Sequence, residues 1–311
     1  MNKISAPMGA VEWALLLVLS LLWGGSFLFA KVAVGELPPL TVAFLRVSIA
    51  AATLVAIVRI RGLGMPSGRE WLPFLVMGTI NNVIPFGLLF WAMTQVTSGL
   101  AAILNATTPL FTVLCAHVLT ADERMTPQKL AGVLIGLGGV AVMIGLDTLS
   151  GLGLDVLAQL ACVGAAVSYA FATIWGRRLS GRPPLVVAAG QVTSSSILLL
   201  PIILVVDTPW RLSAPSAATA GAILALALAA TALAYLIYFR ILQTAGSTNL
   251  SLVTFLIPVS ALALGALLLG ETVTASNLAG MVLIGIGLAA IDGRPFSAIR
   301  AVAAGRRVRA R

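Results

Sequence analysis

The stretch T-S-G-L-A-A-I-L-N-A-T-T-P-L-F-T-V-L (residues 97–114) decides the fold, because a later stretch repeats its plan. That later stretch, G-S-T-N-L-S-L-V-T-F-L-I-P-V-S-A-L-A (residues 246–263), carries its proline at the matching place. Each copy continues through an acidic turn into a glycine-rich apolar run, K-L-A-G-V-L-I-G-L-G-G in one and N-L-A-G-M-V-L-I-G-I-G in the other. A repeat on this scale indicates one structural unit used twice. With one gap, the matched pairs include Ser98 with Ser247, Pro109 with Pro258, Glu123 with Glu271, Gly132 with Gly280, and Gly139 with Gly287.

The duplication continues upstream at lower identity. P-P-L at residues 38–40 matches P-P-L at residues 183–185, which places Arg46 opposite Gln191. The pattern F-x-x-x-F at residues 86–90 likewise matches Y-x-x-x-F at residues 235–239. We therefore predict a first five-helix repeat over residues 1–146, a second over residues 147–293, and a basic tail over residues 294–311.

The composition is that of a membrane protein. Of the 311 residues, 59% are hydrophobic and 9% are charged, whereas a soluble domain carries about 25% charged residues. A run of about 20 apolar residues crosses a bilayer core of about 30 Å. The sequence predicts an all-α integral membrane protein with ten such spans and no soluble domain, at about residues 11–34, 40–60, 71–92, 98–119, 129–146, 157–176, 185–206, 217–239, 247–269 and 276–291.

Lysine and arginine are distributed unevenly between the two sides of the membrane that these spans define. Sixteen fall on one side, two (Lys31 and Arg211) on the other, and Arg46 lies inside a span. The positive-inside rule then places both termini in the cytoplasm. The basic tail is interpreted as a cytoplasmic anchor that touches anionic lipid, not as a nucleic-acid site. The sixteen are Lys3, Arg59, Arg61, Arg69, Arg124, Lys129, Arg177, Arg178, Arg182, Arg240, Arg294, Arg300, Arg306, Arg307, Arg309 and Arg311.

Five spans per repeat is an odd number, so the second repeat must enter the membrane from the opposite face. Such inverted-topology repeats are the architecture of many secondary transporters, whose substrate site lies near the midplane between the halves. We therefore expect two inverted five-helix repeats around a central cavity.

The ten spans, the W-G-G-S-F motif at residues 23–27 and the paired proline–acidic–L-A-G pattern resemble the drug/metabolite transporter superfamily, in its EamA-type branch. The resemblance covers nearly the whole chain. It implies export of small metabolites such as amino acids across the bacterial inner membrane, and the aromatic amino-acid exporter group has the same layout. It also implies a central cavity from which the fifth and tenth spans stand apart.

Arg46 is the most informative single residue of the sequence. It lies about 6–8 residues into the second span, where a charge costs at least about 2.5 kcal/mol unless it faces protein or water. Its guanidinium suits a bidentate pair with a substrate carboxylate. The alternatives are that the side chain extends to the membrane surface or donates to helix carbonyls.

Other polar and aromatic side chains lie inside the spans. Amides within a membrane either join helices or line a cavity, and deep aromatic rings either pack in the core or line a pocket. Together they suit a mixed polar and apolar site. The predicted substrate-binding residues are Arg46, Trp23, Asn82, Phe86, Asn105, Tyr169, Gln191 and Tyr235.

Two further predictions concern motion and assembly. Pro109 and Pro258 each remove a helix hydrogen bond, so they are predicted hinges, with a static kink as the alternative. The motif G-x-x-x-G at residues 132–136 permits close helix approach. It serves contacts within the chain or a homo-oligomer formed through the glycine-rich spans.

The sequence predicts no catalytic residue, metal or cofactor. It lacks the G-x-x-x-x-G-K-[ST] motif of ATP sites and the H-E-x-x-H motif of zinc enzymes. Cys115 and Cys162 lie inside apolar runs without the spacing of a metal site. We predict a secondary transporter, not an enzyme, which moves a small molecule by alternating access without ATP. The alternatives are a membrane enzyme acting on lipid and a membrane sensor without transport.

Overall fold

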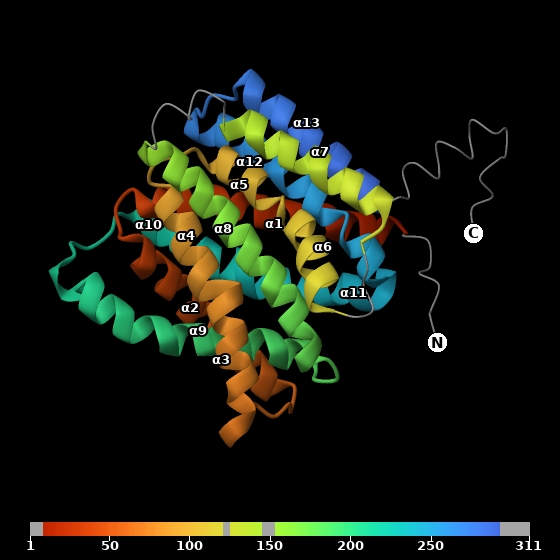
Figure 1. Ribbon diagram of the computed structural model, residues 1–311. Helices are drawn as coiled ribbons and strands as arrows, with labels where there is room; N and C mark the ends of the chain where they lie inside the picture. The colour runs from red at the N-terminus through yellow and green to blue at the C-terminus, as the bar shows by residue number, and fades with distance from the viewer. Residues whose placement is uncertain (1–8, 121–124, 145–152, 293–311) are drawn as a thin grey trace.

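The computed structural model describes residues 9–120, 125–144 and 153–292, and this part of the chain forms helices and no strands (Figure 1). Eight helical stretches are long and apolar enough to cross a membrane. Two shorter apolar helices, Pro127–Met143 and Val253–Leu269, complete a set of ten. The predicted all-α membrane fold is confirmed.

The first repeat follows the predicted order of spans closely. Its third span is one continuous stack of short helices, and its fourth is broken in the middle. The elements are α1 (Ala10–Val34); α2 (Pro39–Ile60); η1 (Gly68–Trp71), α3 (Leu72–Gly78), η2 (Thr79–Val83) and α4 (Ile84–Ala92); α5 (Ser98–Asn105) and α6 (Thr108–Leu119); and α7 (Pro127–Ile144).

The second repeat has the same plan. Its elements are α8 (Leu154–Trp175) and η4 (Gly176–Leu179); α9 (Pro184–Val206) and η5 (Pro209–Arg211); α10 (Ala217–Leu224), η6 (Ala225–Leu233) and α11 (Ala234–Leu250); α12 (Val253–Leu269); and α13 (Ala275–Asp292).

One predicted boundary in this repeat is wrong. The eighth span was expected to end at residue 239, but the helix continues to a break at Gly246, where φ is 80°. Hydropathy falls after Phe239 because Arg240, Gln243 and Thr244 are polar, whereas the helix itself needs only its backbone hydrogen bonds. The break falls immediately before the predicted start of the ninth span at residue 247.

The matched prolines upstream begin matched helices. Pro39 and Pro184 occupy the first helical position of α2 and α9, where proline has no hydrogen bond to lose. Pro38 and Pro183 precede them in extended conformation, with ψ of 142° and 128°. The matched P-P-L sequences therefore begin their helices with the same backbone geometry in both repeats.

The third and eighth spans share a feature that the sequence does not reveal. Each contains a π-helical segment, η2 (Thr79–Val83) in one and η6 (Ala225–Leu233) in the other. The F-x-x-x-F and Y-x-x-x-F match places η2 within the range of η6 and sets Asn82 opposite Thr231. Segments of π-helix are rare and often lie at functional sites.

The two matched prolines of the fourth and ninth spans differ in their surroundings. Pro109 lies in the first turn of α6, directly after the break between α5 and α6. Pro258 lies inside α12. The first copy is therefore two helices instead of one long kinked helix, and the hinge role of both prolines stays a prediction.

Helices α7 and α13 pair with each other at the periphery of the bundle (Figure 1). They approach through glycines. A Cβ added at Gly132 would lie 2.6 Å from the Gly287 carbonyl oxygen, and one at Gly139 would lie 2.8 Å from the Gly280 carbonyl oxygen. The four glycines thus form a seam within one chain, which is the intramolecular alternative. A homo-oligomer through these spans stays a prediction.

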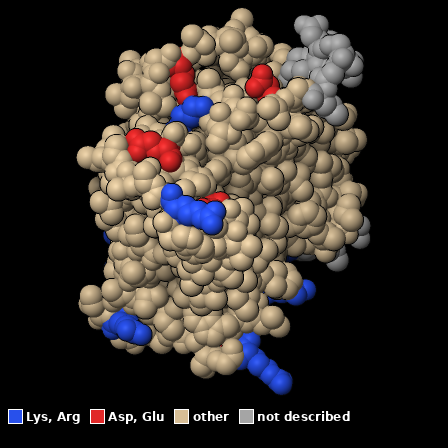
Figure 2. Space-filling view, turned by 90° about the vertical axis from the view of Figure 1, so that its left-hand side faces the viewer, with Lys and Arg blue, Asp and Glu red and all other residues tan. Residues whose placement is uncertain are grey.

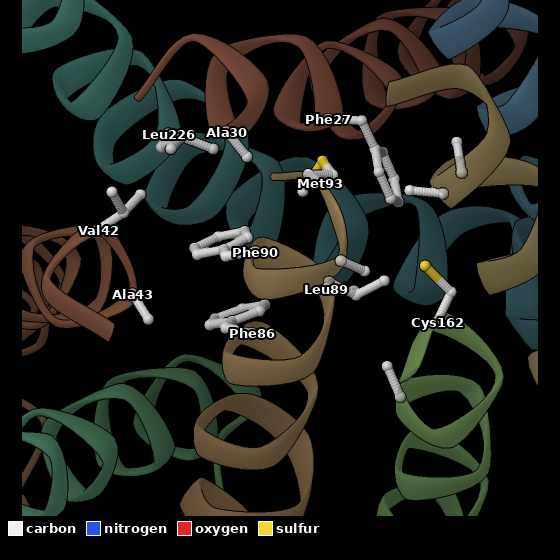
Figure 3. Packing of buried hydrophobic residues seen from close by; sticks show 14 of the residues in the cluster. Phe27, Ala30, Val42, Ala43, Phe86, Leu89, Phe90, Met93, Cys162 and Leu226 are labelled. Atoms are coloured by element: carbon white, nitrogen blue, oxygen red, sulfur yellow. The ribbon is translucent and has the colours of Figure 1, made fainter. Parts of the chain in front are cut away.

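The remaining helices surround the interior of the bundle. Figure 3 shows Phe86 and Phe90 of α4 projecting toward Ala43 of α2, with Phe27 of α1 beside Met93. Helix α2 packs on α9, and α1 packs on α12, so the principal contacts join one repeat to the other. The interior is therefore built from both halves.

The seam predicts a clear difference between neighbouring glycines. Gly139→Ala should destabilise the protein by about 1–3 kcal/mol, because the added methyl group overpacks a backbone contact. Gly138 is exposed, with nothing within 4 Å of an added Cβ. Gly138→Ala should therefore leave stability unchanged or slightly increased. Thermal unfolding in detergent measures both, and equal midpoints would contradict the seam.

Candidate functional site

A cavity of about 550 Å³ lies between the two repeats. Its lining residues come from both repeats, on α1, α2, α3, η2, α4, α5, α6, α8, η4, α9, α11 and α12. All eight residues predicted to bind substrate lie on its wall: Trp23, Arg46, Asn82, Phe86, Asn105, Tyr169, Gln191 and Tyr235. Of the predicted hinges, Pro109 lines the cavity and Pro258 does not. The structure thus brings the polar and aromatic candidates together, and their binding roles stay predictions.

Arg46 is held inside the bundle by two contacts. Its Nε donates to Thr231 Oγ1 across 3.0 Å, and its guanidinium carbon lies 4.2 Å from the centroid of the Phe86 ring. The residue is 7% exposed. The side chain therefore neither extends to the membrane surface nor donates to a helix carbonyl among the described residues. It contacts a hydroxyl and the face of a ring, which is a favourable cation–π geometry.

The charge of Arg46 has no counter-ion in the described part of the chain. No described carboxylate lies within ion-pair distance of its guanidinium. A guanidinium has five N–H donors, and the hydrogen bond to Thr231 accounts for one of them. The other donors are available to a group that enters the cavity.

A hydrogen-bonded chain of two amides and a tyrosine also lies on the cavity wall. Asn81 Nδ2 donates to Gln191 Oε1 (3.1 Å), and Gln191 Nε2 donates to the Tyr235 hydroxyl (2.6 Å). This arrangement mirrors the Arg46 contact, because Gln191 is the repeat counterpart of Arg46. Each of these two residues bonds to the π-helical segment of the opposite repeat. The two repeats are therefore joined by polar contacts at matched positions, Arg46 to η6 and Gln191 to η2.

Two amide oxygens beside the cavity have no protein partner. Asn82 Nδ2 donates to Ser195 Oγ (2.8 Å), but Asn82 Oδ1 is buried without a hydrogen bond. Asn105 Oδ1 is buried and unpaired in the same way, at the last residue of α5. Buried polar atoms without partners are costly, so these oxygens are acceptors in need of a donor.

Aromatic rings cover much of the remaining wall. Phe86 and Phe90 stack with centroids 5.6 Å apart, and their counterparts Tyr235 and Phe239 stack at 6.1 Å. Trp23 meets Tyr238 at 5.7 Å. The cavity thus offers flat apolar faces beside a cation and several amides.

Sequence reasoning missed several residues of this wall. Tyr238 lies three residues after Tyr235 on one helix, so helical spacing could have placed the two on one face. Asn81 adjoins Asn82 in η2. Thr231 does not line the cavity but contacts Arg46, and it could have been found from its alignment with Asn82, although a lone threonine in an apolar span gives a weak signal. Further lining residues include Ser26, Met77, Thr108, Thr173 and Thr254.

The two ends of the molecule differ in charge. In the view of Figure 2, Asp and Glu side chains gather in the upper half, whereas the lower end carries only Lys and Arg. We call the end with Glu36, Asp207 and Glu271 the acidic end. The end with Arg69 and Arg182 is the basic end.

At the acidic end, Glu271 of the second repeat caps helix α5 of the first. Its carboxylate accepts hydrogen bonds from Ser98 N (2.7 Å), Ser98 Oγ (2.8 Å) and Gly99 N (3.2 Å). A negative charge at a helix N-terminus is favourable because free N–H groups point toward it. Gly265 makes room, since a Cβ there would collide with the Glu271 carboxylate.

Two more carboxylates join the repeats at the acidic end. Glu36 accepts hydrogen bonds from Ser216 N (2.8 Å) and Ser216 Oγ (2.6 Å), and Asp207 accepts one from Thr41 Oγ1 (2.6 Å). The hydrogen bonds from Ser216 hold the pKa of the Glu36 carboxyl below its ordinary value. Glu36 therefore stays charged, and keeps these contacts, throughout the neutral pH range.

Lys31 of α1 binds the connection between α4 and α5 at the acidic end. Its Nζ donates to the carbonyls of Met93 (2.6 Å) and Val96 (2.9 Å), just beyond the C-terminus of α4. A cation near a helix C-terminus is favourable for the same reason that an anion is favourable at the N-terminus. The connection between α4 and α5 is thus held by Lys31 at its start and by Glu271 at its end.

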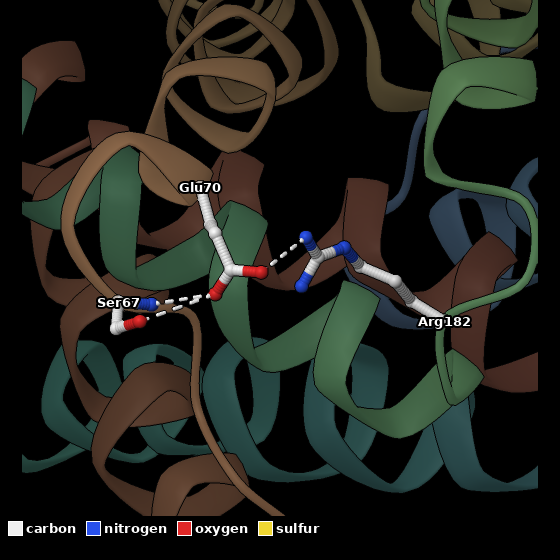
Figure 4. Close-up of polar contacts among 3 residues, drawn as sticks. All are labelled: Ser67, Glu70 and Arg182. Atoms are coloured by element: carbon white, nitrogen blue, oxygen red, sulfur yellow. Dashed lines mark hydrogen bonds and ion pairs between the residues drawn. The ribbon is translucent and has the colours of Figure 1, made fainter.

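At the basic end, the repeats are joined by one described ion pair and by neutral contacts, among them the hydrogen bond from Trp175 Nε1 to the Pro73 carbonyl (3.0 Å). Arg182 Nη2 lies 3.0 Å from Glu70 Oε1, and both side chains are substantially exposed (Figure 4). Exposed ion pairs of this kind contribute about 0–1 kcal/mol. No group of three or more metal-ligating side chains occurs among the described residues.

Comparisons with known proteins agree with this architecture. The sequence model of the EamA-like transporter family matches the chain twice, at residues 11–145 and 156–291. A crystal structure with 23% identity has a TM-score of 0.65 over 90% of this chain and 97% of that chain, which shows a shared fold.

Named relatives are transporters. A probable amino-acid metabolite efflux pump of Escherichia coli (strain K12) is 28% identical over 90% of this chain and 94% of its own length. An uncharacterized inner membrane transporter of the same organism, YedA, is 26% identical over 83% of each chain. The protein described here is a multi-pass membrane transporter and belongs to the EamA-like transporter family.

Proposed function

We propose that this protein is a secondary transporter that exports small carboxylate-bearing metabolites, amino acids among them, across the bacterial inner membrane. The observation that carries the proposal is Arg46, a buried guanidinium on the cavity wall without a counter-ion among the described residues. A substrate carboxylate would supply that counter-ion. Each charge would then offset the desolvation of the other.

The rest of the cavity supports a substrate with both polar and apolar parts. The unpaired oxygens of Asn82 and Asn105 suit a hydrogen-bond donor such as an ammonium group. The rings of Trp23, Phe86 and Tyr235 suit an apolar or aromatic body. The name of the Escherichia coli relative, an amino-acid metabolite efflux pump, agrees with this substrate class.

We infer that the cavity is open toward the basic end and closed at the acidic end. Leu89 and Met93 are buried on its acidic side, whereas Thr173 is exposed on its basic side. Three carboxylates join the repeats at the acidic end, while the described ion pair at the basic end is exposed. Alternating access would then require the acidic-end contacts to break, with the α5–α6 break before Pro109 supporting a hinge there.

The orientation in the membrane is tested by reporter fusions. The excess of lysine and arginine at the basic end predicts that this end is cytoplasmic. Fusions after Ile60 and Arg182 should report the cytoplasm, and fusions near Thr97 and Asp207 the periplasm. A cytoplasmic signal at Asp207 would rule out the inverted arrangement.

The substrate class is tested at Arg46 in proteoliposomes. The probes are the proteinogenic amino acids other than aspartate and glutamate, each paired with its α-amide, which lacks the carboxylate. Arg46→Gln should lose roughly 1.5–3 kcal/mol of a charge-assisted contact, or about tenfold to hundredfold in apparent affinity for the acids. The amides should be unaffected, because they make no such contact.

The control for Arg46 is the same substitution elsewhere. Arg240 is exposed on α11, away from the cavity, so Arg240→Gln should transport like the wild type. Equal losses for acids and amides with Arg46→Gln would mean that Arg46 only joins helices. Absence of flux for all probes would favour a lipid-acting enzyme or a sensor.

The closure of the acidic end is tested at Glu271. A single cysteine is placed in the cavity as Ser26→Cys, in a background with Cys115→Ser and Cys162→Ala. A membrane-impermeant maleimide is added on the side of the acidic end. Glu271→Gln should raise its labelling rate by about tenfold, because loss of the charge weakens the cap on α5.

Glu12→Gln is the matched control for Glu271. Glu12 accepts a hydrogen bond from Gly9 N within its own helix, so its loss should leave labelling unchanged. If Glu271→Gln lowers thermal stability but leaves labelling from each side unchanged, Glu271 is a static cap and not part of a gate.

A further inference from the structure

Thr231 holds Arg46 through a hydroxyl whose own proton is already engaged. Arg46 Nε lies 3.0 Å from Thr231 Oγ1, and Thr231 Oγ1 donates to the Leu226 carbonyl across 2.8 Å. A threonine hydroxyl has one proton and two lone pairs. With the proton directed at Leu226, the lone pairs are left to accept the N–H of Arg46.

The π-helical segment η6 sets this geometry. The Thr231 hydroxyl bonds to a carbonyl five residues earlier, which is the spacing of a π-helix. In the ordinary helix α2, by contrast, the Thr53 hydroxyl bonds to the Ile49 carbonyl four residues earlier. The wider turn of η6 therefore determines where the hydroxyl oxygen stands relative to Arg46.

Two fixed contacts leave the guanidinium little freedom. Phe86 lies against its face at 4.2 Å from the ring centroid, and Thr231 holds its Nε. A guanidinium can meet a carboxylate through its Nε edge or through its two terminal nitrogens. Because Nε is occupied by Thr231, only the terminal pair is left for a bidentate contact.

We propose that Thr231 is a positioning residue for substrate specificity: it turns the terminal nitrogens of Arg46 toward the cavity for end-on pairing with a carboxylate. This inference rests on the proposed function and deepens it. The first repeat has Asn82 at the place of Thr231, and the second has Gln191 at the place of Arg46. The first repeat therefore supplies the cation and the second supplies the hydroxyl that holds it, whereas the repeat-related residues Gln191 and Asn82 carry no charge. The carboxylate end of the substrate is therefore assigned to the side of the cavity where Arg46 lies.

The test compares Thr231→Val, which keeps the shape of the side chain and removes the hydroxyl, with Thr231→Ser, which keeps the hydroxyl. In proteoliposomes, Thr231→Val should raise KM about fivefold to tenfold for the best-transported L-amino acid and leave its amide unchanged. Thr231→Ser should stay within about twofold of the wild type for both. If Thr231→Val fails to insert, Thr231→Ala removes the same hydroxyl without filling its space.

The matched control is Thr53→Val, which removes a hydroxyl that bonds only its own helix, outside the cavity. It should alter neither KM. Equal losses for acid and amide with Thr231→Val, no loss for either, or a loss with Thr231→Ser as large as with Thr231→Val, would each overturn the inference. Selectivity lost with Arg46→Gln but kept with Thr231→Val would reject this role and leave the proposed function standing.

A measurement on the protein without substrate distinguishes failure of the proposed function from failure of the contact between Thr231 and Arg46. In nitrogen-15 spectra, the Nε–H of Arg46, assigned by its loss in Arg46→Lys, should be protected from exchange in the wild type and in Thr231→Ser. Thr231→Val should abolish the protection. If no amino acid is transported yet this pattern holds, the proposed substrate class fails while the Thr231 contact is supported. Unchanged protection in Thr231→Val would overturn the contact itself.

Discussion

A guanidinium inside an apolar bundle must be held by protein or by water, because lipid offers neither charge nor hydrogen bonds. The interior around Arg46 is arranged to meet this requirement. A ring face, a hydroxyl and a cavity surround the cation, and the ring comes from α4 of the first repeat while the hydroxyl comes from η6 of the second. Under the proposed function, the uncompensated charge of Arg46 would favour a carboxylate over a neutral substrate, since a neutral substrate would leave the cation without a counter-ion.

The same requirement explains why residues predicted from the sequence lie together on the wall of one cavity. A polar or charged side chain in an apolar span has to face the interior, so Arg46, Asn82 and Gln191 could be placed without a structure. The membrane spans could be placed because the length of an apolar run is enough to indicate a helix that crosses the bilayer. Helix α11 runs past its predicted end because Arg240, Gln243 and Thr244 lower the hydropathy without breaking the backbone hydrogen bonds of the helix.

The features that the sequence did not reveal depend on backbone geometry or on contacts between distant segments. No propensity distinguishes the π-helical turns η2 and η6 from ordinary helix, and Thr231 gains its importance only from such a turn. The cap of Glu271 on Ser98 joins residues 173 positions apart. The two repeats have also diverged: the match of P-P-L sets Glu36 opposite Gly181, so one end has a carboxylate where the other has none.

The glycine seam between α7 and α13 has a mechanical consequence. Two helices in contact through their backbones at Gly132 and Gly139 have no flexible side chains between them to absorb sliding. A shift by one turn would place larger side chains against the opposite backbone, so the pair resists translation more than rotation. Because each helix ends one repeat, the seam would act as a pivot between the two halves in the alternating access proposed above.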